Sequence, residues 1–148
     1  MLLTIARTLM LLWLAPSLAL AGNALVIADP WSPEAPPGRM MAGFLTLENT
    51  GTEAIALVDG ESPEFGHVEI HTMMMDDGVM RMRKLDELVI EPGEIVELKP
   101  GGLHLMLMQP AQSFKAGQTI DITLIDKQGN EYALVSEVRK RNRPMMTD

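Results

Sequence analysis

Apolar and polar residues alternate along most of this sequence, over short segments bounded by glycine, proline or asparagine. A period of two is typical of β-strands that bury one face. The clearest case is TIDITLID and EYALVSEVRK, joined by KQGN, which predicts a hairpin. The same pattern predicts strands near residues 25–28, 41–49, 53–60, 67–72, 79–85, 94–99, 103–108, 119–126 and 131–140. No segment longer than two turns has the pattern of an amphipathic helix, so the sequence predicts an all-β sandwich or barrel.

The first predicted strand, 25–28, is followed by the proline-rich sequence DPWSPEAPPG. Proline has no N–H to donate to a sheet and is disfavoured in helices and central strands. We therefore expect an edge strand followed by an extended loop, from which Trp31 covers the core.

The segment LHLMLM places different chemistry on its two faces. Alternate residues of a strand share a face, so Leu103, Leu105 and Leu107 lie together. The other face carries His104, Met106 and Met108. Methionine is usually core filler, but the leucines already supply a core face. His104 and Met106 therefore have another role, for which metal binding is the leading interpretation.

A second segment carries matching residues. His71 ends the predicted strand VEIH, Asp77-Gly78 is a turn signal, and VMRM places Met80 and Met82 on one face of the returning strand. We expect His71 and Met82 on the two arms of a hairpin. Two imidazoles and two thioethers from neighbouring strands form a soft, uncharged donor set that suits Cu(I).

Other residues near this segment are weaker candidates. His67 is an auxiliary ligand or a surface residue, with the surface role favoured. Met73, Met74 and Met75 are expected in the hairpin loop, where they offer a landing point for Cu(I) or shield the site from water. Exposed runs of apolar residues are normally avoided, which singles out this run. Met80 completes the set of auxiliary candidates.

The spacing His71-x10-Met82-x21-His104-x-Met106 resembles the motif of the periplasmic copper chaperones of the PCuAC family. The phrases VEIH, DGVMRM and PGGLHLML are also similar to the family's, and the resemblance extends more loosely over most of the chain. It implies a cupredoxin-like or immunoglobulin-like Greek-key β-sandwich. It also implies a carrier that binds Cu(I) and passes it towards the CuA centre in subunit II of cytochrome c oxidase.

The N-terminus is typical of a secretory signal peptide. Arg7 precedes the apolar segment TLMLLWLAPSLAL, and Ala19-Leu20-Ala21 fits a cleavage site. A membrane helix is less favoured, because the apolar run is short and contains Pro16. We expect a signal peptide at 1–21, a copper-binding domain at 22–138 and a basic, disordered tail at 139–148. The mature protein is expected to be periplasmic, monomeric and not membrane-spanning.

Composition narrows the functions further. The 148 residues include no cysteine, which excludes disulfides, a lipid-anchored cysteine and a thiolate blue-copper centre. The formal net charge of −8 disfavours nucleic acid as a partner. The sequence contains neither G-x-S-x-G nor H-E-x-x-H, so we expect no enzyme. Copper buffering or resistance, and a structural β-sandwich without metal, stay open as alternatives to copper delivery.

Overall fold

The computed structural model describes residues 24–141, and all regular secondary structure in this range is β-strand. This range accordingly holds no helix that is long and apolar enough to cross a membrane. The predicted signal peptide at 1–21 and residues 142–148 of the predicted tail lie outside the described residues. The strands are β1 (Leu25–Pro33), β2 (Met41–Asn49), β3 (Ile55–Ser62), β4 (Phe65–Asp76), β5 (Val79–Lys84), β6 (Leu88–Ile90), β7 (Ile95–Leu98), β8 (His104–Pro110), β9 (Thr119–Asp126) and β10 (Glu131–Arg139).

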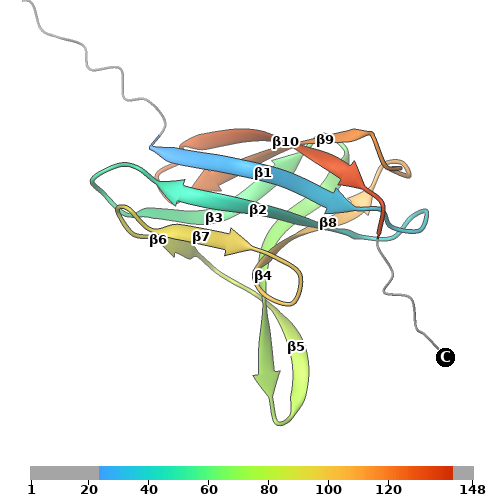
Figure 1. Ribbon diagram of the computed structural model, residues 1–148, viewed down its shortest axis with the longest axis horizontal. Helices are drawn as coiled ribbons and strands as arrows, with labels where there is room; N and C mark the ends of the chain where they lie inside the picture. Colours follow the sequence, from blue (N-terminus) through green and yellow to red (C-terminus); the bar gives the residue numbers. More distant parts are fainter. Residues whose placement is uncertain (1–23, 142–148) are drawn as a thin grey trace, which may run out of the picture.

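The sheet closes on itself, which confirms the predicted all-β class. Its hydrogen-bonded order is β5-β4-β8-β2-β1-β10-β9-β3-β6, and a further pairing of β3 with β4 joins the path into a ring. The β1–β10 pair is parallel, and the other pairs in the described chain are antiparallel. The result is a β-sandwich (Figure 1), whose interior holds one cluster of buried hydrophobic side chains.

β1 corrects one prediction, since it is a central strand rather than an edge strand. It lies between β2 and β10 and extends to Pro33. The pairing with β2 shifts register between Ala28 and Trp31, and Asp29 has a φ of 45°. This bulge accommodates Pro30 without a ladder hydrogen bond. Trp31 therefore lies in a strand, with its ring centroid 4.9 Å from that of Phe44.

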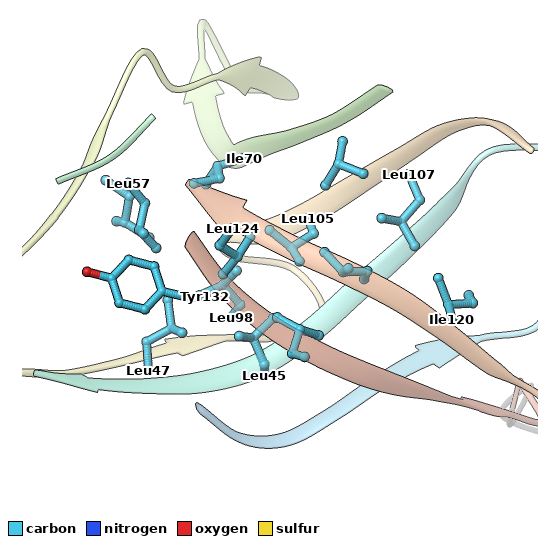
Figure 2. Close-up of a cluster of buried hydrophobic side chains, with 14 of the residues drawn as sticks. Leu45, Leu47, Leu57, Ile70, Leu98, Leu105, Leu107, Ile120, Leu124 and Tyr132 are labelled. Carbon is cyan, nitrogen blue, oxygen red and sulfur yellow. The ribbon is translucent and has the colours of Figure 1, made fainter. Parts of the chain in front are cut away.

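The leucine face of β8 enters the core, as the alternation predicted. Leu105 and Leu107 are fully buried, and Ile70 of β4 joins them in the same cluster. Figure 2 shows these side chains among Leu124 and Ile120. Because side chains alternate across a strand, the residues between them on β4 and β8 must face outward.

The β9–β10 hairpin forms as predicted and contains a buried polar contact. The Tyr132 hydroxyl donates a 2.9 Å hydrogen bond to Asp126, which is 5% exposed and also accepts hydrogen bonds from Gln128 and Asn130. Burial alone raises the pKa of Asp126, but these hydrogen bonds outweigh it and the pKa is lowered. Burial and the Asp126 carboxylate raise the pKa of Tyr132 to about 12.

We expect Tyr132→Phe to lower the free energy of unfolding by about 2 kcal/mol at neutral pH, because it removes a hydrogen bond to a buried carboxylate. The folded-state pKa of Tyr132 lies above its ordinary value, so this stabilisation is complete below about pH 10 and is lost as the pH rises towards about 12. Urea unfolding at pH 7 to 11 measures both effects. The difference in stability between the two proteins should narrow between pH 10 and pH 11, and a difference that stays constant would contradict the assignment.

Candidate metal site

The site lies where β4 leaves the body of the sandwich. β4 pairs with β8 from Phe65 to His71, and its pairing with β3 ends at Val68. Beyond His71, in the described chain, β4 pairs with β5 alone. The β4–β5 hairpin consequently projects from the sandwich as a two-stranded ribbon (Figure 1). His71 is thus the last residue of β4 that is held on both sides.

His71 and His104 are directly opposite each other on β4 and β8. Their ring centroids are 5.8 Å apart, with the planes tilted by 44°. His104 is 6% exposed, and the side chain of His71 is 15% exposed. The two histidines that the sequence places 33 positions apart therefore form one half-buried pair on the outer face of the sheet.

Each histidine of the pair has one nitrogen engaged and the other free. The Nε2–H of His71 donates to Glu69 Oε2 at 2.8 Å, and the Nδ1–H of His104 donates to the Gly102 carbonyl oxygen at 3.0 Å. A carbonyl or carboxylate oxygen accepts, so these bonds fix the tautomer of each neutral ring. His71 Nδ1 and His104 Nε2 are buried without a hydrogen-bond partner in the described chain.

Two unpaired imidazole lone pairs are costly to bury. In metal sites, a histidine usually donates its other N–H to a carboxylate or carbonyl, which orients the ring and makes the ligating nitrogen more basic. The pair shows both kinds of partner. Two histidine ligands of one metal ion would each show this combination of one oriented N–H and one free nitrogen, and their role as ligands stays a prediction.

Glu69 connects the pair to β5. Its carboxylate accepts hydrogen bonds from His71 at 2.8 Å and from Lys84 Nζ at 3.0 Å. The bond from His71, and then that from Lys84, lower the pKa of Glu69 against the effect of burial. An ionised Glu69 at neutral pH therefore holds His71 by a charge-assisted hydrogen bond.

The structure brings Met106 close to the pair. Met106 lies opposite Glu69 and two residues from His104, so it is diagonal to His71 on the same outer face. It is 7% exposed, yet it is not part of the main hydrophobic cluster. Met106 is therefore buried beside the histidine pair and outside the main cluster, and its role as a ligand stays a prediction.

Met82 lies farther out than the other predicted ligands. On β5, Lys84 is opposite His71, and Met82 is opposite Met73. Met82 is therefore diagonal to His71, on the same face but one step along the ribbon, and it is 54% exposed. The fold thus gathers His71, His104 and Met106 in the sandwich and carries Met82 on the adjoining ribbon.

The auxiliary candidates separate by position. His67 is exposed and lies opposite Met108 on the face of the histidine pair. The prediction that Met73, Met74 and Met75 lie in a loop is wrong, because β4 continues through them to Asp76. The turn is only Asp77-Gly78, with a φ of 52° and 78°. In the described part of the chain, no three His, Asp or Glu side chains are grouped to hold a metal.

The fold places this protein with known all-β domains. The copper-bound PCuAC domain from PmoF2 superposes with a TM-score of 0.67, at 19% identity, covering 80% of this chain and 95% of that domain. The solution structure of CuI-DR1885 from Deinococcus radiodurans gives a TM-score of 0.64 at 27% identity, covering 84% of this chain and 83% of the other. The predicted β-sandwich fold is confirmed.

Sequence comparison then gives the family. The family model described as "Putative lipoprotein LpqE-like" matches residues 25–138, and the chain belongs to this family. It is 30% identical over 118 residues to the putative lipoprotein Lxx21020 of Leifsonia xyli, covering 79% of this chain and 70% of that protein. It is 39% identical over 83 residues to the uncharacterized protein RP573 of Rickettsia prowazekii, covering 55% of this chain. The match spans only 46% of the length of RP573.

Substitution tests the assignment of the two faces of β8. We expect the double substitution His104→Ala, Met106→Ala to leave the metal-free protein folded, because neither residue belongs to the main core. The matched control is Leu105→Ala, Leu107→Ala, in which each lost core side chain costs about 3 kcal/mol. Urea unfolding of both variants measures the difference. Equal destabilisation of the two would place His104 and Met106 in the core.

Proposed function

We propose that this protein is a Cu(I) carrier whose ligands are His71, Met82, His104 and Met106. The observation that carries this proposal is the facing histidine pair, in which each ring has one oriented N–H and one buried, unpartnered nitrogen. The structural relatives solved with copper support it. The role is binding and transfer rather than catalysis.

The donor set fits Cu(I) chemically. Imidazole nitrogens and thioether sulfurs are neutral, and soft thioethers select Cu(I) over the divalent ions that prefer oxygen. Met106 supplies a sulfur beside the pair, and the ribbon supplies Met82 from one step farther out. In this proposal the ribbon must bend at its base to bring Met82 to the histidines, and a ribbon of only two strands packs little against the sandwich that would oppose this. The same bending offers a route for release by ligand exchange.

We further infer that the protein works outside the cytoplasm, in the periplasm. The predicted signal peptide at 1–21 and the description of the LpqE-like family support export. The 148 residues contain no cysteine to which a lipid could be attached. The proposed acceptor is a copper site such as the CuA centre of cytochrome c oxidase subunit II.

X-ray absorption spectroscopy tests the ligand set. With one equivalent of Cu(I) added without oxygen, we expect a shell of two nitrogens and two sulfurs around the metal. Substitution of His71 and His104 by alanine should remove the nitrogen scattering and weaken binding by several orders of magnitude. A shell of oxygen and nitrogen alone would contradict the proposal. Absence of binding would favour a structural β-sandwich.

The affinity for Cu(I) should fall in acid. Protons compete with Cu(I) for an imidazole lone pair but not for a thioether. The slope of the logarithm of the affinity against pH should therefore approach two protons per copper in acid. Replacing His71 with methionine keeps a soft ligand but removes one site of competition, and the slope should fall by about half. Competition with a Cu(I) chelator between pH 8 and 5 measures this. An unchanged slope would exclude His71 as a ligand and point to His67.

A further inference from the structure

The β4–β5 ribbon has two faces of different chemistry. Cross-strand partners share a face, and the register pairs Met73 with Met82 and Met75 with Met80. One face of the ribbon therefore carries four thioethers in two adjacent cross-strand pairs. We call these four residues the methionine face.

The opposite face carries the charged residues of the ribbon. Its cross-strand pairs are Thr72–Arg83, Met74–Arg81 and Asp76–Val79. Asp76 accepts a 3.2 Å hydrogen bond from Arg83 and lies 3.6 Å from Arg81. These contacts lie on the face opposite the four methionines. On the side of the methionine face, the charged residue of β5 is Lys84 at the base of the ribbon, where it donates a hydrogen bond to Glu69.

Core packing does not explain the methionine face. The ribbon stands away from the sandwich (Figure 1), Met75 is 66% exposed, and Met80 and Met82 are about half exposed. A large exposed apolar patch on a monomer usually marks a binding site. Methionine also differs from leucine at such a place because its thioether is a soft ligand for Cu(I).

The methionine face also leads to the histidine pair. Successive same-face positions on a strand are about 7 Å apart. Along β4 these positions are Met75, Met73 and His71, and their partners on β5 are Met80, Met82 and Lys84. The thioethers thus continue in line from the tip of the ribbon to the half-buried pair.

We propose that the methionine face is a second Cu(I) site, formed by Met73, Met75, Met80 and Met82, which receives the ion before it reaches the histidine pair. This inference rests on the proposed function, because its destination is the site of His71 and His104. Met82 belongs to both ligand sets but ligates one ion at a time, so when two ions are bound one of the sites holds its ion through its other three ligands. Transfer exchanges one neutral ligand for another at Cu(I), so neither the oxidation state nor the protonation of the thioethers changes.

Oxygen-free titration with Cu(I) against a competing chelator, combined with X-ray absorption, tests this site in the purified protein. The wild type should bind two Cu(I), one of them more weakly. The double substitution Met75→Leu, Met80→Leu should lose the weaker ion and keep the one bound through nitrogen and sulfur. The double substitution His71→Ala, His104→Ala should retain one ion with sulfur ligands only.

Met74→Leu is the matched control, because Met74 is 49% exposed and adjacent to Met75 but lies on the ionic face. It should bind both ions as the wild type does. Leucine approximates methionine in volume, so these substitutions should leave the fold unchanged.

Loss of the second ion in the Met74→Leu variant, or its retention in the Met75→Leu, Met80→Leu variant, would overturn the proposal of a methionine-face site. Retention of one nitrogen-bound ion in those proteins would leave the proposed function intact. If the wild type binds no Cu(I) through nitrogen, the proposed function itself is wrong.

Silver titration gives an independent measurement on the unmodified protein, since Ag(I) is a soft ion that does not change oxidation state. The methyl resonances of Met73, Met75, Met80 and Met82 should shift on addition of Ag(I), and that of Met74 should not. Shifts confined to Met106 and the histidines would contradict a site on the methionine face. Such a result would leave docking of another protein as the explanation for the exposed methionines.

Discussion

The antiparallel pairing of β4 with β8 is the constraint on which the site depends. Its register places His71 opposite His104, and the alternation on both strands sends Ile70, Leu105 and Leu107 into the core. A register slip of one residue would exchange the two faces, so that the imidazoles would point into the hydrophobic core in place of the leucines. The burial of the leucine face therefore fixes the register, and the register fixes the histidine pair.

The same pairing determines how the site is exposed. The pairings of β4 with β3 and β8 end at or before His71, so His71 lies at the margin of the sandwich. His104, its partner on β8, is more deeply buried. Glu69 and the Gly102 carbonyl each accept a hydrogen bond from one ring, and the other nitrogen of each ring is buried without a partner in the described chain. In the proposed carrier, the histidine pair within the sandwich would retain the ion, and the thioethers of the projecting ribbon would allow its release.

Much of this could be predicted from the sequence because β-strand alternation is local. The alternation in LHLMLM predicts correctly which side chains of the strand enter the core. The turn sequences KQGN and Asp77-Gly78 predict the two hairpins that form. The central position of β1 could not be predicted, because a bulge at Asp29 accommodates Pro30 and is set by pairing with distant strands. The run MMM has no alternation of apolar and polar residues, so the sequence predicts a loop there. In a projecting ribbon both faces of the strand are exposed, and no such alternation is required.

The tautomers of the histidine pair could not be read from sequence either, since they depend on the partners that folding supplies. They also provide the most direct test of the account. Nitrogen-15 NMR of the imidazole rings should show the proton on Nε2 of His71 and on Nδ1 of His104 without metal. Addition of one equivalent of Cu(I) should shift His71 Nδ1 and His104 Nε2. Binding through the opposite nitrogens, or unchanged resonances of both rings, would contradict the proposed site.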